Sequence, residues 1–356
     1  MENKLAVLVT GVGGRAVGHQ ILHALLLLGD TYQVVASDAE AFSFGLYLVQ
    51  DRHLLPVAND PAYLPTLMEI IARHKIRAIL PGTEAEGRVL VAHVEPLAAR
   101  GCVLISSPGE VVRLCADKGA LSQWLMEHGY EVPLTVNAEQ WHRLVSVTGF
   151  PIVGKPAKLS GGSRDVALLN DEAEVERYLA QRPQGLEVIF QQYVGSADAE
   201  YTVGVMVSKS GQIIDSIAMH RKLIGLSLGQ SRRLQGGNFA LSTGYSQGFI
   251  VKHALIQEKC EELALRLGVR GPANFQLRLV GKRVVFFEVH PRFSGTSSIR
   301  ASVGFNEPDV LIRNFVLNET FRRLSYQTEV AAIRAFQHAI VPLSAVQAVE
   351  AARCQP

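Results

Sequence analysis

Over its first hundred residues the chain alternates short apolar runs with helical patterns of apolar positions. Runs of strand length occur at LAVLVTG (5–11), YQVVASD (32–38), IRAILPG (76–82) and CVLISS (102–107). The segments between them, such as GHQILHALLLLGD and AYLPTLMEIIARHKI, repeat apolar positions with a helical period. Strands that alternate with helices predict a parallel sheet covered on both faces. We therefore expect an open α/β domain with four strands over residues 1–107.

The pattern changes after Pro108 and Gly109, a pair that marks a break in regular structure. A stretch with helical periodicity follows. From about residue 144 short strands are joined by Gly-containing turns, with helices expected at DEAEVERYLAQ and FIVKHALIQEKCEELALRLG. This pattern is typical of an α+β arrangement with antiparallel hairpins. The segment VAAIRAFQHAIVP near the end fits either a strand or a buried helix.

Composition narrows the class of protein. The chain has 356 residues, 48% hydrophobic and 19% charged, which indicates a globular protein of two or three domains. A net charge of +2 predicts neither a nucleic-acid nor a membrane partner. The four cysteines have no disulfide or metal spacing, and neither a signal peptide nor a membrane-length apolar run is evident. We therefore expect a cytoplasmic protein with reduced thiols.

The glycine-rich turn GVGGRA follows the first strand. Gly11, Gly13 and Ala16 fit the G-x-G-x-x-G/A spacing, and Asp38 ends the next strand. In dinucleotide-binding domains such glycines let the backbone approach a pyrophosphate, and the acid binds a ribose hydroxyl. The alternative is a tight strand-to-helix turn whose amides face the domain cleft.

Two later stretches have features of a nucleotide site. In FPIVGKPAKLSGGSRDV, Lys155 ends a strand and a loop with Gly161, Gly162 and Ser163 follows, a combination that suits phosphate oxygens although it is not a P-loop. In EVIFQQYVGSADAEYTVGV, a strand runs into residues 192–194, whose backbone could meet a purine edge, and Glu200 opens the next strand. An ordinary hairpin tip and a solvated glutamate are the alternatives.

The stretch FFEVHPRFSGT places Glu288, His290 and Arg292 at alternate positions. Side chains of a strand alternate between its faces, so Gln276 of the preceding strand shares their face only if the hairpin loop is odd in length. A three-residue loop at residues 281–283 would place Gln276 opposite Glu288. Oxygen ligands on a strand pair suit Mg²⁺, and Arg292 would reach a phosphoryl oxygen. A surface ion cluster is the alternative.

In this order, the motifs resemble those of ATP-grasp enzymes, in particular the large subunit of carbamoyl phosphate synthase and the carboxylate–amine ligases like it. The matching segments are LVTGVGG, LPGTEAE, CADKGALSQWLMEHGYEVP, KPAKLSGGSRDV, QQYVGSADAEYTV, NFQLRL and FEVHPRFSGT. The resemblance covers about residues 5–315. It implies a pre-ATP-grasp domain over 1–107, a small subdomain with linker helices over 108–190, a large subdomain over 191–325 and a C-terminal tail over 326–356.

The resemblance also implies roles for individual residues. The expected phosphate contacts are Lys118, Lys155, Gly161, Gly162 and Ser163. The adenine hinge would be Gln192, Tyr193 and Val194, with Glu200 on the ribose. The metal positions would be Gln276, Glu288 and His290, and the catalytic residues Arg292 and Lys155. In this superfamily the first domain usually helps to bind substrate and carries no NAD, so Asp38 has no assigned role.

The implied activity is ATP-dependent activation of a small carboxylate as an acyl phosphate, which an amine or other nucleophile then attacks, with release of ADP and phosphate. Candidate substrate contacts are Glu84 or Glu86 for an amino group and Arg221 and Arg300 for a carboxylate. The chain departs from the family pattern at His290, where the family has asparagine. Imidazole suits Mn²⁺ and later metals better than Mg²⁺.

Other functions stay open. An NAD(P)-dependent oxidoreductase would explain the first domain alone, and a nucleotide-binding protein without ligase activity would explain His290. A homodimer is a further expectation.

Overall fold

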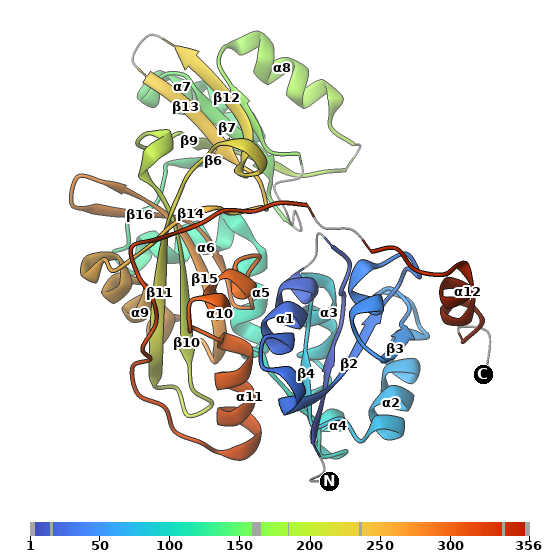
Figure 1. Cartoon of the computed structure of the whole chain (residues 1–356). Coiled ribbons are helices and arrows are strands. Elements are labelled where there is room, and N and C mark those ends of the chain that lie inside the picture. Colours follow the sequence, from blue (N-terminus) through green and yellow to red (C-terminus); the bar gives the residue numbers. More distant parts are fainter. Residues whose placement is uncertain are drawn as a thin grey trace.

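The computed structural model describes residues 4–14, 17–158, 165–183, 185–234, 237–336 and 339–352, without side-chain detail for 232–234 and 237. The first domain contains a five-stranded parallel sheet in the order β3-β2-β1-β4-β5 (Figure 1). Its strands are β1 (Leu5–Val9), β2 (Tyr32–Asp38), β3 (Asp51–Leu54), β4 (Ala78–Leu80) and β5 (Val103–Leu104). Its helices are α1 (Val17–Leu26), α2 (Tyr63–His74), α3 (Glu84–Leu90) and α4 (Val94–Ala98). The predicted α/β class is confirmed.

Two details of this domain differ from the sequence expectation. The sheet has a fifth strand, β3, whose first three residues are polar and only half-buried because the strand lies at the edge of the sheet. One expected helix is two, α3 and α4. Pro96 lies in the first turn of α4, where a missing N–H costs little, whereas one continuous helix would hold it in the interior.

A six-stranded antiparallel sheet forms the centre of the second half, in the order β16-β15-β10-β11-β14-β17. Its strands are β10 (Glu200–Val207), β11 (Ile213–Arg221), β14 (Gly248–Val251), β15 (Gly271–Val280), β16 (Arg283–His290) and β17 (Val330–Ala332). The associated helices are α5 (Gly109–Ala116), α6 (Lys118–Glu127), α9 (Ala254–Leu267), α10 (Ser297–Ser302) and α11 (Glu307–Leu317). Helices α5, α6 and α9 share one apolar core with β10, β15 and β16.

A smaller antiparallel sheet, in the order β6-β9-β7-β8, lies above the large one in Figure 1. It comprises β6 (Thr135–Asn137), β7 (Ile152–Pro156), β8 (Ala167–Leu169) and β9 (Val188–Gln192), with α7 (Trp141–Thr148) and α8 (Glu172–Gln181). A hairpin of β12 (Leu228–Leu234) and β13 (Gly237–Ser242) contacts β8. The short 3₁₀ helices are η1 (Gly29–Thr31), η2 (Phe44–Leu48), η3 (Ala138–Gln140), η4 (Ala197–Ala199) and η5 (Gly225–Ser227).

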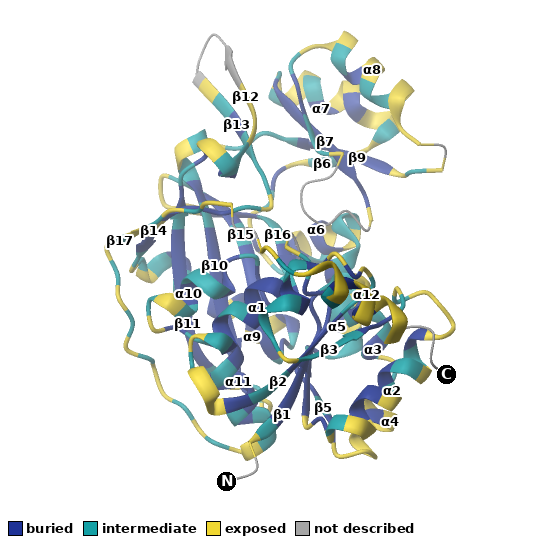
Figure 2. Cartoon of the chain, turned by 45° about the vertical axis from the view of Figure 1, so that its right-hand side comes forward, coloured by how far each residue is buried: buried dark blue, intermediate teal, exposed yellow. Residues whose placement is uncertain are grey.

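The first domain and the large sheet meet through a packed apolar interface. One core cluster includes residues of β1 and α1 together with residues of β11 and α11, and Figure 2 shows buried positions continuing through the strands on both sides. Long-range hydrogen bonds also cross the interface, among them those from Ser298 to Gln20, from Tyr32 to Asp309 and from Asn306 to the carbonyl of Ala24. The interface therefore fixes the first domain against the large sheet.

The hairpin of β15 and β16 reaches the expected pairing by a different route. Gln276 lies opposite Glu288, as the odd-loop argument required, but Val280 pairs with Arg283, so the loop has two residues. The missing residue is supplied by a β-bulge, because Leu277 pairs with Phe286 and leaves Phe287 extra. Bulges re-aim side chains beside functional sites, and Phe287 lines the main cavity.

The C-terminal segment joins the two halves of the molecule a second time. Strand β17 pairs with β14 at the edge of the large sheet, and the chain then runs to α12 (Leu343–Ala351), which packs against β3 of the first domain (Figure 1). The segment VAAIRAFQHAIVP therefore begins as a short strand, and no buried helix forms in its described part. None of the helices in the described ranges has the length and apolar character to cross a bilayer.

Candidate functional site

A cavity of about 200 Å³ lies between the large sheet, the small sheet and the first domain. At one end, called here the hinge end, it is lined by Gln192, Tyr193, Val194 and Glu200. At the other, called here the interdomain end, it is lined by Val17, Ser246, Ser294 and Gly295. Between the ends lie Lys118, Lys155, Gln276, Glu288, His290 and Arg292.

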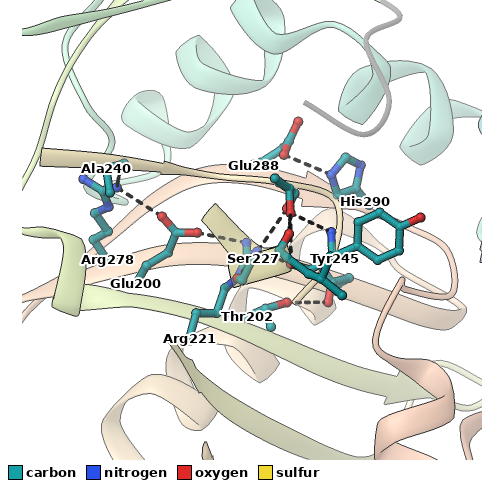
Figure 3. Close-up of polar contacts among 12 residues, drawn as sticks. Glu200, Thr202, Arg221, Ser227, Ala240, Tyr245, Arg278, Glu288 and His290 are labelled. Atoms are coloured by element: carbon teal, nitrogen blue, oxygen red, sulfur yellow. Dashed lines mark hydrogen bonds and ion pairs between the residues drawn. The ribbon is translucent and has the colours of Figure 1, made fainter. Parts of the chain in front are cut away.

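The hinge end contains a buried charge network. Both oxygens of Glu200 accept hydrogen bonds, one from Arg221 at 2.9 Å and one from Arg278 at 3.1 Å, and Figure 3 shows the carboxylate between the two guanidinium groups. All three side chains are buried. Arg278 also lies 4.2 Å above the centre of the Tyr193 ring and donates to the carbonyl of Val194. The network therefore fixes the backbone of the hinge.

The register of the large sheet explains this network. Glu200 opens β10 directly opposite Arg278 of β15, and Arg221 ends the neighbouring strand β11. Burial lowers the pKa of Arg221, while the nearby Glu200 acts in the opposite direction. Because two cations share one carboxylate, the network keeps an excess of positive charge beside the cavity.

Lys155 lies at the centre of the cavity, on β7. Its side chain is buried, and Nζ donates to Oε1 of Gln191 at 2.9 Å. Burial lowers the pKa of Lys155 to about 8, against the attraction of Glu288. Such a lysine gains by meeting a bound anion, because the anion replaces the lost hydration.

A row of alternating charges runs beside the cavity and consists of Glu288, His290, Glu84 and Arg292. Nε2 of His290 lies 3.2 Å from Oε2 of Glu288, as Figure 3 shows, and Nδ1 lies 3.2 Å from Oε1 of Glu84. Arg292 donates to the same Glu84 oxygen through Nε at 3.1 Å and Nη2 at 2.6 Å. Glu84 begins α3, so the first domain supplies one carboxylate of this row of charges.

Each group in this row of charges favours the ionised form of its neighbour. Burial would raise the pKa of Glu288, but His290 and Lys155 lower it to about 2. Burial likewise opposes ionisation of Glu84, yet Arg292 and His290 hold the pKa of Glu84 well below its usual range. Burial and Arg292 depress the pKa of His290, but the two carboxylates outweigh them and raise it, which favours the imidazolium.

The donor set fits a Mg²⁺ ion only in part. Gln276 and Glu288 present an amide and a carboxylate on paired strands, and Mg²⁺ accepts few protein oxygens because water and phosphate complete its shell. His290 fits less well, since both ring nitrogens already face carboxylates. Among the residues described, no group of three or more His, Cys, Asp or Glu side chains could hold a metal ion.

Most of the expected site residues lie together. Those that line the cavity are Lys118, Lys155, Gln192, Tyr193, Val194, Glu200, Arg221, Gln276, Glu288, His290 and Arg292. Gly161, Gly162 and Ser163 lie outside the described residues. Glu84 lines a smaller adjoining cavity and reaches the site through its contacts with Arg292 and His290.

Arg300 does not line the cavity. Its guanidinium is buried, pairs with Glu307 at 2.8 Å and donates to Asn274 at 2.7 Å. Arg300 therefore holds α10 against α11 and β15, away from the cavity in which a substrate carboxylate would bind.

In the glycine-rich turn of the first domain, the carboxylate of Asp38 binds the backbone of the turn itself. Oδ2 of Asp38 accepts a hydrogen bond from the backbone N–H of Gly13 at 2.7 Å. Gly18 and Gly82 pack so closely on Thr10 that an added Cβ would lie about 2 Å from its carbonyl oxygen. These glycines are therefore required for the packing of the strand-to-helix turns. Glu86 is buried beneath the turn, and burial raises its pKa to about 7.

Sequence reasoning missed several residues at the site. Arg278 could have been found, since the antiparallel register places it opposite Glu200. Gln191, next to the predicted hinge, points to the other face of its strand and binds Lys155. Asn274 lies opposite His290 and accepts from Thr202. Arg334, from the C-terminal segment, had no local signal.

The fold is that of ATP-grasp proteins, with a Rossmann-like first domain. Residues 197–338 match the family model for ATP-grasp in the biosynthetic pathway with Ter operon, and residues 7–105 match the PylC-like N-terminal domain. The chain thus resembles ATP-grasp proteins over its second half and PylC-like proteins over its first, and these matches agree with the resemblance proposed from its motifs.

A curated relative matches most of this chain in sequence. The chain is 23% identical over 311 residues to the carbamoyl phosphate synthase large chain of Streptomyces avermitilis, an alignment that covers 83% of this chain and 27% of the relative. The chain thus spans about a quarter of that relative's length.

Two solved structures share the fold. N5-carboxyaminoimidazole synthetase from Staphylococcus aureus, complexed with ADP, has a TM-score of 0.63 at 13% identity and covers 91% of this chain and 81% of its own. L-amino acid ligase from Bacillus licheniformis has a TM-score of 0.62 at 17% identity and covers 89% and 75%.

Proposed function

We propose that the protein is an ATP-dependent ligase that activates a small carboxylate as an acyl phosphate and transfers the acyl group to an amine or another nucleophile. One observation carries the proposal: Lys118, Lys155 and Arg292 line the same cavity as the oxygen donors of Gln276 and Glu288. Cations beside oxygen donors for a metal are what phosphoryl transfer requires. The related ligases and synthases support it.

The nucleotide would bind from the hinge end. The adenine would meet the backbone of Gln192 to Val194, and Glu200, held by its two arginines, would accept from the ribose hydroxyls. The phosphates would extend toward Lys118 and Lys155. Gln276 and Glu288 would hold a Mg²⁺ ion, or Mn²⁺, which when bound neutralises phosphate charge.

The chemistry then needs positioning more than covalent participation. A substrate carboxylate oxygen forms a bond to the γ-phosphorus while the bond to the β-phosphate oxygen breaks, which yields ADP and an acyl phosphate. Arg292, oriented by Glu84, would neutralise the oxygens of the transferred group. The acceptor then attacks the acyl carbon, phosphate leaves with the bonding electrons, and the acceptor nitrogen loses a proton.

The test combines binding and turnover. Mg-ADP should raise the melting temperature, because a ligand that binds only the folded state stabilises it, and NADH should not. ADP release should then require a carboxylate and an acceptor, which a screen of amino acids and small carboxylates identifies. Stabilisation by NADH without stabilisation by Mg-ADP would contradict the proposal and favour an oxidoreductase.

A second candidate is a nucleotide-binding protein without ligase activity. It is motivated by His290, whose two nitrogens face Glu84 and Glu288 where a metal would bind. This candidate predicts stabilisation by ADP with no substrate-dependent ADP release in Mg²⁺ or Mn²⁺. The expected homodimer and the cytoplasmic location stay predictions, of which the first is tested by light scattering.

A further inference from the structure

The C-terminal strap, defined here as residues 329–336, lies along the interdomain end of the cavity. It is fixed to the large sheet, because Glu329 donates its backbone N–H to Ile250 at 2.7 Å and β17 pairs with β14. Upstream, Arg323 pairs with Asp215 and Glu261. The strap is therefore anchored two residues before Arg334.

Arg334 joins three segments that are far apart in the sequence. Its Nε donates to the carbonyl of Ser246 at 2.9 Å, and Nη1 donates to Oε1 of Gln20 at 3.2 Å. Nη2 donates to the carbonyl of Gly295. Ser246 and Gly295 line the cavity, and Gln20 belongs to α1 of the first domain. One guanidinium thus holds three walls of the interdomain end together.

Within the described residues, Arg334 has no carboxylate partner, whereas the other arginines near the cavity each pair with a glutamate. Arg221 and Arg278 pair with Glu200, Arg292 pairs with Glu84, and Arg300 pairs with Glu307. The ion pairs found within the described ranges do not include Arg334, and the oxygens that it binds belong to two carbonyl groups and an amide.

The surroundings of Arg334 are otherwise neutral or positive. Burial lowers the pKa of Arg334 to about 10; the hydroxyl of Tyr245 acts in the opposite direction, and the nearby Arg221 in the same direction as burial. Burial and the neighbouring His23 and Arg334 lower the pKa of His19 to about 4, so this imidazole is neutral. Nδ1 of His19 is buried and has no hydrogen-bond partner among the residues that the structure describes.

We propose that Arg334 makes the interdomain end selective for an acceptor substrate that carries a carboxylate group, as an amino acid does. This inference rests on the proposed ligase function. A guanidinium carries two N–H groups on each terminal nitrogen, and within the described part of the chain each terminal nitrogen of Arg334 makes one hydrogen bond, which leaves a second donor for a ligand. A carboxylate at this end would supply the negative charge that the other arginines obtain from glutamates.

The test uses the full chain and compares Arg334→Ala with Arg334→Lys and with Arg322→Ala. Arg322 is an exposed residue that precedes the strap, so it serves as the matched control. With a fixed donor carboxylate at saturation, ADP release is measured with an amino acid acceptor and with the amide of the same amino acid. The wild type should prefer the acid at least ~10-fold in kcat/KM, the effect of one charge-assisted hydrogen bond.

Arg334→Ala should lose this preference through a higher acceptor KM, with the KM for ATP within about twofold of the wild type, since the hinge end is built separately. Arg334→Lys should keep part of the preference because the charge remains. Arg322→Ala should match the wild type. An unchanged preference in Arg334→Ala would overturn the inference, as would a parallel rise in both KM values with a lower melting temperature.

A binding measurement separates this inference from the proposed function. The melting temperature of the Mg-ADP complex is compared with proteinogenic amino acids and with their amides. If no substrate pair releases ADP while amino acids still stabilise the wild type and not Arg334→Ala, the ligase proposal fails and the carboxylate site stands. If amino acids and amides act alike in both measurements, the inference is wrong.

Discussion

The hinge end and the interdomain end of the cavity are built in different ways. Glu200, Arg221 and Arg278 come from three adjacent strands of one sheet, are buried, and pair with one another. The interdomain end is assembled from α1, the turn after β16 and the C-terminal strap, and Glu84 of the first domain orients Arg292. The first arrangement suits a constant ligand such as a nucleotide. The second can change with loops and tail while the nucleotide site stays intact.

The largest expected effect comes from the lysine between the two ends. Lys155→Met should lower kcat/KM for ADP release about 100- to 1000-fold, because a preorganised cation facing the phosphates is lost. Lys158→Met is the control, since that side chain is 53% exposed and pairs with Asp117 and Glu187 at the surface. A change of less than about fivefold in Lys155→Met would remove Lys155 from the proposed chemistry.

A pair of glutamate variants tests the comparison directly. Glu200→Gln should lower the free energy of unfolding by about 3–5 kcal/mol, because Arg221 and Arg278 would keep buried charges without a carboxylate. Glu84→Gln should cost only about 1–2 kcal/mol, since that side chain is 29% exposed.

The effects on kcat should rank in the opposite order: in the variants that fold, Glu84→Gln should lower kcat more than Glu200→Gln does. Glu84→Gln should lower kcat about tenfold with little change in the KM for ATP, because Arg292 loses its orientation. Urea titration and ADP-release kinetics on both variants provide the measurements. Equal effects of the two variants on stability and on kcat would mean that the two ends are not distinct.

His290 contacts two carboxylates between the ends of the cavity, Glu288 of the large sheet and Glu84 of the first domain. His290→Asn should lower the half-saturating Mg²⁺ concentration roughly fivefold, the change that about 1 kcal/mol gives. Asparagine would free Oε2 of Glu288 and remove a competing positive charge. Titration of Mg²⁺ at saturating ATP measures this, and a higher Mg²⁺ requirement would show that the imidazole supports the site.

The smallest expected effect concerns pH and the first domain alone. Nε2 of His53 lies 2.7 Å from Nε2 of His74, and burial, then His74, lower the pKa of His53 from 6.5 to about 4. The folded state therefore favours the neutral ring. Its contribution to stability is present above pH 6.5 and is lost as the pH falls from 6.5 to 4.

Urea titrations at several pH values measure this loss. His53→Gln should flatten the decline in stability between pH 6.5 and 4, and the exposed His142→Gln should leave it unchanged. If the first domain loosens on its own, the acceptor KM should rise at pH 5 before the KM for ATP does. An identical pH profile in His53→Gln would exclude the histidine pair as the cause.

The parts of the site that depend on neighbouring strands could be predicted from the sequence. Period-two alternation placed Gln276 opposite Glu288, although the bulge at Phe287 rather than a longer loop makes up the register. A bulge depends on local backbone geometry that alternation does not encode. The helix expected from residue 249 begins only at Ala254, because residues 248–251 pair with β11 and β17.

The parts that depend on tertiary contact could not be predicted. Arg334 lies 39 residues from Gly295 and 314 from Gln20 in the sequence, and its own surroundings, AAIRAFQ, carry no motif. The contact between Glu84 and Arg292 spans 208 residues. Strand β3 was missed because its polar edge lacks an apolar pattern.

The second connection between the domains also sets a mechanical limit. Ten residues, Ile333 to Pro342, separate the end of β17 from the start of α12. Fully extended, such a tether reaches about 33–36 Å. While both its anchors hold, the first domain and the large sheet cannot separate by more than this length allows. The segment that places Arg334 against two residues lining the cavity therefore also limits how far the two halves of the molecule can separate.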